Sequence, residues 1–141
     1  MRVRADRYAI ASASALCPVC DCWTHVVALL VPQRHTVASD QGWGIAAGRA
    51  WLFHVNETSA AVLVRLAVIS PWYRPATGGT GRVFVNHCEH CASPLDDHDL
   101  HCEPGGAFQP SSEAEAAGVS LWHIDEPLDV DASGLAHEPD F

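Results

Sequence analysis

The chain has 141 residues, 17 of them Asp or Glu and eight of them Arg, with no Lys, so its formal net charge is −9. This length leaves room for one domain, and an apolar fraction of 48% excludes a disordered chain. The lack of Lys excludes the phosphate-binding loops and Schiff-base enzymes that depend on it, and no apolar run reaches the roughly 20 residues that cross a bilayer.

The first 16 residues are expected to be the N-terminal arm of a single domain that spans residues 1–141. Residues 8–16 follow three Arg but alternate Ala with Ser, so they lack the apolar core of an export signal. We therefore expect a cytoplasmic protein. In that reducing compartment, six cysteines are more typical of metal ligands or buried thiols than of disulfides, with an exported disulfide-bonded protein as the alternative.

Apolar segments rich in β-branched residues predict an antiparallel sheet of four or five strands. The strands are expected at residues 23–31, 50–55, 82–86, 95–102 and 119–124. Residues 32–48 mix polar residues with glycines around a Trp, so we expect a long loop with no more than a short edge segment.

One principal helix is predicted after the second strand. Asn56 offers a helix cap, and apolar residues recur at helical spacing from Thr58 to Ile69. A brief helix is expected near residues 111–117, and residues 125–141 are expected to be a loose acidic tail. The expected fold class is therefore α+β, an antiparallel sheet with one main helix.

Two Cys-x-x-Cys pairs, Cys17 with Cys20 and Cys88 with Cys91, are the strongest motif. Two intervening residues let a tight turn direct both sulfurs at one ion, and two such turns supply the tetrahedral four-sulfur set of structural zinc sites. Here 67 residues separate the pairs, whereas compact ribbons separate theirs by roughly 15–20. We therefore predict a structural Zn²⁺ that closes a long loop around a folded lobe.

The two pairs, Cys-Pro-Val-Cys at 17–20 and Cys-Glu-His-Cys at 88–91, resemble those of the zinc-ribbon group. Residues 86–95 also look like the ribbon of small bacterial proteins with no settled activity. The resemblance implies a structural zinc held by the four cysteines and implies nothing about catalysis. Rubredoxins share the paired turns and bind iron, but they are much shorter, so an iron site is the minor alternative.

Two further cysteines lie outside the pairs. Cys22 and Cys102 are expected to be small buried side chains. Cys22 lies two residues after Cys20, so in a strand its sulfur would face the same side. The alternative is therefore that Cys22 exchanges with Cys20 as a metal ligand.

Four histidines have weaker ligand patterns. His87 and His90 flank the second pair and are expected to form hydrogen bonds beside the metal, with replacement of one cysteine as the alternative. His98 and His101 have metal-binding chemistry, but a strand would place them on opposite faces, which disfavours a catalytic metal there.

Charge is divided unevenly along the chain. Residues 1–82 hold all eight Arg and carry +4, whereas residues 83–141 carry −13. The acidic half repels nucleic acid and favours a basic protein partner, so we expect a small acidic interaction protein that binds and neutralises such a partner. The first partner to test is a cationic nuclease toxin, which would make the chain an immunity protein. The contacts are expected in the acidic group beside the second Cys pair: Asp96, Asp97, Asp99 and Glu103.

The alternative function is that of a nucleic-acid-associated zinc ribbon. Its basic patch would be built from five of the arginines: Arg34, Arg49, Arg65, Arg74 and Arg82. No enzyme is expected, because the chain has neither a Gly-x-Ser-x-Gly nor a His-Glu-x-x-His motif and four thiolates leave a zinc ion no open position.

Overall fold

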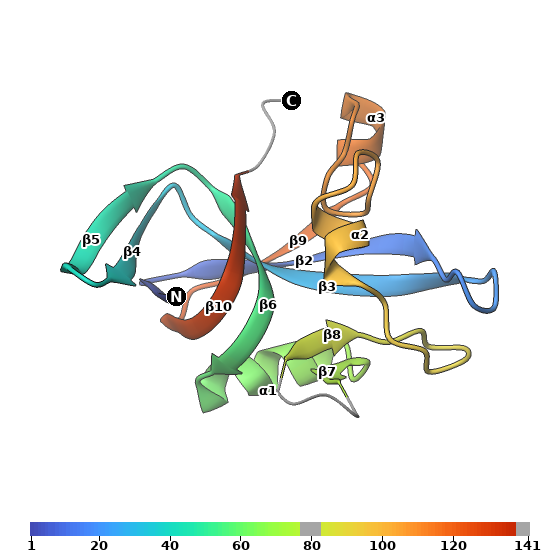
Figure 1. Cartoon of the computed structure of the whole chain (residues 1–141), viewed down its shortest axis with the longest axis horizontal. Helices are drawn as coiled ribbons and strands as arrows, with labels where there is room; N and C mark the ends of the chain where they lie inside the picture. Colours follow the sequence, from blue (N-terminus) through green and yellow to red (C-terminus); the bar gives the residue numbers. More distant parts are fainter. Residues whose placement is uncertain (77–82, 138–141) are drawn as a thin grey trace.

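The computed structural model describes residues 1–76 and 83–137, and one curled antiparallel sheet of ten strands dominates it (Figure 1). The strands are β1 (Arg2–Ala5), β2 (Tyr8–Leu16), β3 (Trp23–Val31), β4 (Arg34–Ser39), β5 (Gly42–Ala47), β6 (Ala50–Thr58), β7 (Tyr73–Pro75), β8 (Phe84–Asn86), β9 (Ser120–Ile124) and β10 (Leu128–His137). The helices are α1 (Ala60–Ile69), α2 (Asp97–His101) and α3 (Glu113–Ala116). The main path through the sheet is β5-β4-β1-β10-β6-β3-β2-β9, with β8 beside β6 and β7 beside β8.

The expected α+β fold with four or five strands is wrong, because three segments expected to be irregular form strands. Residues 32–48 contain the hairpin β4–β5. The expected N-terminal arm, residues 1–16, forms β1 and β2, and the expected loose tail contains β10, which lies between β1 and β6. Small residues, glycines and acids occupy much of these strands, and an antiparallel strand needs to be apolar only where it faces a core.

Strand β10 shows how an acidic segment becomes part of the sheet. Its alternate apolar side chains are buried: Leu128, Val130 and Ala132. The acids between them point outward, where Asp129 accepts a 2.8 Å hydrogen bond from Arg2 Nε and Asp131 accepts one of 2.8 Å from the N-terminal amine of Met1. The acids of this strand are thus paired with β1, which neutralises them within the chain.

Both faces of the curled sheet are covered. On β3, Val27, Leu29 and Val31 belong to one core, which α1 covers with Val62 and Leu66. The intervening Val26, Ala28 and Leu30 belong to a second core, which contains Cys17 and Cys88 together with Leu100 of α2 and Phe108. The second core therefore joins the two cysteine pairs to the sheet.

The predicted helix forms as α1, preceded by Ser59 rather than by the expected cap Asn56. Asn56 lies in β6, and its Nδ2 donates to Ser133 Oγ of β10. Of the residues of α1, only Val62 and Leu66 are buried. No helix within residues 1–76 and 83–137 has both the length and the apolar character needed to cross a membrane.

The predicted return strand at residues 95–102 is instead the short helix α2. The side chain of Asp96 caps it by accepting a 2.8 Å hydrogen bond from the backbone N–H of His98. An acid followed by further acids in the first turn favours a helix start, which outweighs the weak strand pattern. The predicted brief helix and last strand form as α3 and β9. The predicted strand at 82–86 forms as β8, with Arg82 outside the described residues.

Candidate metal centre

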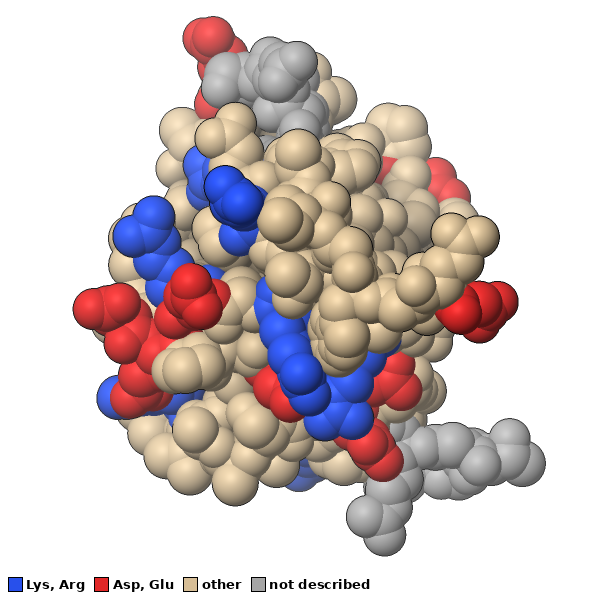
Figure 2. All heavy atoms as spheres, turned by 90° about the vertical axis from the view of Figure 1, so that its left-hand side faces the viewer, with Lys and Arg blue, Asp and Glu red and all other residues tan. Residues whose placement is uncertain are grey.

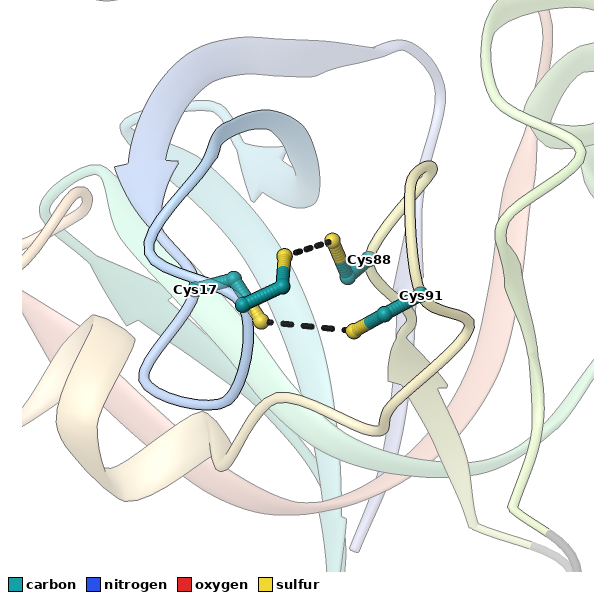
Figure 3. A group of neighbouring side chains, drawn as sticks. Cys17, Cys88 and Cys91 are labelled. Carbon is teal, nitrogen blue, oxygen red and sulfur yellow. Dashed lines mark hydrogen bonds between the residues drawn. The ribbon is translucent and has the colours of Figure 1, made fainter.

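Two turns that are distant in sequence bring four cysteines together (Figure 3). Cys17 and Cys20 lie in the turn between β2 and β3, and Cys88 and Cys91 lie in the turn after β8. The Sγ atoms of Cys17 and Cys91 are 3.7 Å apart, and those of Cys20 and Cys88 are 3.6 Å apart. All four sulfurs lie within 4.8 Å of one another, so the predicted ligand set is assembled.

These distances fit a tetrahedral metal ion. Four sulfurs at about 2.3 Å from a central zinc lie about 3.8 Å from one another, close to the separations between the two turns. Cys17 and Cys88 are buried, Cys20 is half-buried and Cys91 is exposed, so the cluster lies at the edge of the second core. A set of four thiolates can therefore hold one metal ion here, and its soft donors suit zinc.

The two turns share one backbone design. In the first, the N–H of Asp21 donates to the carbonyl of Cys17 over 2.9 Å, and in the second the N–H of Ala92 donates to that of Cys88 over 2.8 Å. Both donors lie four residues after the first cysteine of their pair, and both adopt a positive φ, 57° for Asp21 and 64° for Ala92. This left-handed residue reverses the chain and leaves both sulfurs of the pair on one side.

The residue five positions after the first cysteine distinguishes the two turns. Cys22 in the first turn and Ser93 in the second each accept, through the backbone carbonyl, a 2.9 Å hydrogen bond from the N–H of that first cysteine. The side chains differ: Ser93 Oγ lies 3.2 Å from Cys91 Sγ, whereas the Cys22 Sγ is not among the clustered ligand atoms of the described residues. The hydroxyl and the backbone N–H of Ser93 lower the pKa of Cys91 to about 6, and so favour the thiolate.

The four thiols do not all ionise together in the absence of a cation. The backbone N–H of Cys22 favours the Cys20 thiolate, but burial and the neighbouring sulfurs outweigh this and raise the pKa of Cys20. Cys91 and Cys20 are thus shifted in opposite directions, as expected when several acidic groups share one site. A bound divalent cation supplies the charge that lets four thiolates coexist.

Buried polar side chains attach the second turn to the sheet. Asn86 makes two 2.9 Å hydrogen bonds with the backbone of Val27, accepting from its N–H and donating to its carbonyl. The hydroxyl of Thr24, itself buried, accepts from the N–H of Glu89 over 3.1 Å. Asn86 therefore takes the place of a neighbouring strand along β3. The sequence pattern does not mark Asn86 or Thr24 as functional. Ser93 can be found from the sequence, because it lies five positions after Cys88 just as Cys22 lies five positions after Cys17.

The two histidines beside the second pair lie outside the four-ligand group. His87 is buried, and its Nδ1 lies 3.1 Å from the carbonyls of both Trp72 and Val85. His90 Nε2 lies 3.0 Å from the carbonyl of Trp23, the first residue of β3. Both histidines therefore support the turn through backbone contacts.

The structure places the remaining two cysteines, Cys22 and Cys102, on the surface. Cys22 and Cys102 are exposed, not buried, so the expectation that they are core side chains is wrong. Neither lies in a strand: Cys22 lies between the first turn and β3, and Cys102 is the C-cap of α2. The Sγ of Cys22 is not among the clustered ligand atoms of the described residues.

The expected partner-binding acids divide into two kinds. Asp97 is buried, and its Oδ2 accepts a 2.9 Å hydrogen bond from the backbone N–H of His54, which has a φ of 51°. Burial raises the pKa of Asp97, and the His54 N–H partly offsets this rise. Asp97 therefore has a structural role and is not available to a partner. Asp96 caps α2, and Asp99 and Glu103 are exposed beside it.

The structure also separates His98 from His101. His98 is exposed, with its Nδ1 3.5 Å from Glu103 Oε1, and these two residues form with Asp99 a surface group whose ligand atoms lie within 4.8 Å of one another. His101 is buried between Phe53 and Phe108, and burial lowers its pKa to about 3. His101 is thus a neutral core side chain.

Comparison of the chain with protein-family models found no match, and comparison with curated proteins and with solved structures found none either. The clustered cysteines support metal binding, and the expected relation to zinc ribbons rests on the two turns alone.

Proposed function

We propose that the protein is a zinc-stabilised binding module whose acidic helical surface holds a basic protein partner, as an immunity protein holds a nuclease toxin. Zn²⁺ is proposed as the resident ion, bound by Cys17, Cys20, Cys88 and Cys91, because four thiolates at these separations suit it. The metal has a structural role in this proposal. Four protein sulfurs leave no open coordination position for a substrate, and we therefore propose binding and not catalysis.

The distribution of ion pairs carries the proposal. Three acids elsewhere pair within the chain: Glu126 binds Arg65 over 2.7 Å, Asp129 binds Arg2 and Arg4, and Asp131 binds the N-terminal amine. In contrast, the acids at α2 and α3 form no ion pair with Arg2, Arg4 or Arg65 of the described residues, and Glu103 lies 3.5 Å from His98. Figure 1 shows both helices above β2 and β3. We name these acids the acidic surface: Asp96, Asp99, Glu103 and Glu113. Exposed acids without a neighbouring guanidinium are well suited to attract a cationic protein.

The nucleic-acid alternative draws on a different face. A groove of about 1010 Å³ is lined by Arg4, Arg7 and Arg34, with three acids among them. Figure 2 shows blue and red side chains interspersed on this face. Arg65 and Arg74 are engaged elsewhere, with Glu126 and with the ring of Trp72, and Arg82 lies outside the described residues. The expected five-arginine patch therefore has only part of its members in this groove.

The experiment compares two charge-reversed variants of equal net charge. Asp99→Lys with Glu103→Lys alters the acidic surface, whereas Asp6→Lys with Asp125→Lys alters exposed acids at the groove. We expect an immobilised wild-type protein to retain a basic protein from host extract at low salt and an arginine-rich peptide as a defined probe. The first variant should lose both, and the second should keep them. Association should slow as the Debye length falls below about 10 Å.

Two results would contradict the proposal. Equal retention by both variants would mean that the acids serve only solubility. Tight binding of a double-stranded DNA probe by the wild type, abolished by Arg7→Glu with Arg34→Glu, would assign the function to the groove instead.

A further inference from the structure

Strand β5 is an uncovered edge of the sheet. Within the described residues it pairs only with β4, along the whole length of Gly42–Ala47. Alternate residues of such a strand direct their backbone N–H and C=O groups away from the sheet, where only water or another strand can satisfy them. The strand at the other end of the sheet, β9, is less suited to pairing with another chain, because it is shorter and a charged residue, Asp125, follows it directly.

The side chains of β5 do nothing to prevent pairing with another chain. Its sequence, Gly-Trp-Gly-Ile-Ala-Ala, has no charge and no proline, the two features by which natural edge strands commonly block association. Ile45 is 66% exposed and Trp43 is 47% exposed. Gly44 has an ordinary φ, and a Cβ added to it would meet nothing within 4 Å, so neither conformation nor crowding within the chain requires glycine there.

The charges at the two ends of the hairpin are self-complementary. The turn between β4 and β5 carries Asp40, and the opposite end carries Arg34. If a second copy pairs antiparallel with β5, the acidic end of each hairpin faces the basic end of the other. Parallel pairing would place like charges together, so the charges select the antiparallel arrangement.

We propose that two copies of this chain associate through β5, antiparallel, to form one continuous sheet across a two-fold axis. Residues directly opposite each other in an antiparallel pair have their side chains on the same face of the sheet. The two-fold axis must therefore pass between two equivalent residues, one from each copy. With Gly44 at the axis, Trp43 of each copy lies opposite Ile45 of the other. This register forms two aromatic–β-branched cross-strand pairs, and the Arg4 guanidinium, 4.4 Å from the ring centre of Trp43, covers that ring from one side.

The test measures oligomeric state with the zinc-loaded full chain. Sedimentation velocity over a concentration series should show a reversible monomer–dimer equilibrium for the wild type. Ile45→Lys should raise the dimer dissociation constant at least tenfold, because it places a charge on the edge. Val68→Lys is the matched control, since Val68 is 79% exposed on the apolar outer side of α1, the competing docking surface.

A charge experiment tests the orientation of the pair. Asp40→Arg should weaken the dimer severalfold at low salt, and combining it with Arg34→Asp should restore part of the loss. A wild type that stays monomeric at millimolar concentration would overturn the proposal. A dimer that Val68→Lys dissociates and Ile45→Lys does not would also overturn it, by assigning the interface to α1.

Discussion

The two Cys-x-x-Cys turns have the same backbone geometry but very different support. The first closes the hairpin of β2 and β3, whose strands are paired at eight successive positions. The second follows the three-residue strand β8, which meets β6 at a single pair of residues and is held by the Asn86 side chain. One half of the metal site is thus built into a long hairpin, and the other half depends on the short pairing of β8 with β7, on the Asn86 side chain and on the metal itself.

The largest expected effect is the loss of the metal-binding set. Cys88→Ser removes one buried sulfur, and we expect it to lower the melting temperature by about 10 °C or more, since the metal closes a long loop between the turns. Cys102→Ser, at an exposed thiol outside the cluster, should melt like the wild type. Elemental analysis of the freshly purified wild type should find about one zinc per chain. Equal melting of the two variants would refute the ligand assignment.

Removal of the metal should distinguish the two turns directly. After chelation, hydrogen exchange should become fast in residues 86–95, whereas the amides of β2 and β3 should stay protected by their strand pairing. Re-addition of zinc should restore the protection. Equal loss of protection in both turns would show that the hairpin does not hold its half of the site independently.

Asn86→Ala tests the side-chain attachment of the second turn. It leaves the buried backbone N–H and carbonyl of Val27 without partners, and we expect a loss of about 2–4 kcal/mol in the free energy of unfolding. Asn56→Ala is the matched control, because Asn56 makes a single exposed hydrogen bond with Ser133. Denaturant titrations measure both variants. A similar small loss in each would contradict the anchoring role of Asn86.

Glycine at the two positive-φ positions of the turns should increase stability, by less than Asn86→Ala decreases it. Ala92→Gly should stabilise the protein by about 1 kcal/mol, because glycine adopts φ near 64° without the steric cost that alanine incurs. Asp21→Gly should gain less, since aspartate tolerates this region better than alanine. Ala61→Gly in α1 should instead destabilise by about 1 kcal/mol. Thermal melts of the three variants test this ranking.

The smallest expected effect concerns the residue five positions after the first cysteine of each pair, Cys22 or Ser93. The Ser93 hydroxyl lowers the pKa of Cys91, so Ser93→Ala should raise that pKa and let protons displace zinc at a pH a few tenths higher. Cys22→Ser should leave the release pH unchanged. Acid titration with a zinc-sensitive dye measures both midpoints, and a shift in the Cys22 variant alone would reverse the distinction between the turns.

The cysteine spacing predicted the metal centre, because the ligand geometry of zinc is encoded in a few residues and tolerates any lobe between them. The strands with continuous β-branched runs, such as β3, were also predicted. The β4–β5 hairpin and β10 were not predicted, because they contain many small and polar residues. Their strand structure depends on pairing with neighbouring strands that are distant in the sequence or not strongly apolar themselves. Asn86 was missed for the same reason, since its role depends on the distant backbone of Val27.

The 74 positions between Cys17 and Cys91 also set an order in time. At about 5–20 residues per second, the ribosome completes the second pair about 4–15 s after the first. Through that interval the nascent chain offers three thiols, Cys17, Cys20 and Cys22, and no complete site, and these are free to oxidise or to bind zinc incompletely. The reducing state of the cell and its zinc supply during those seconds would then govern the yield of folded protein.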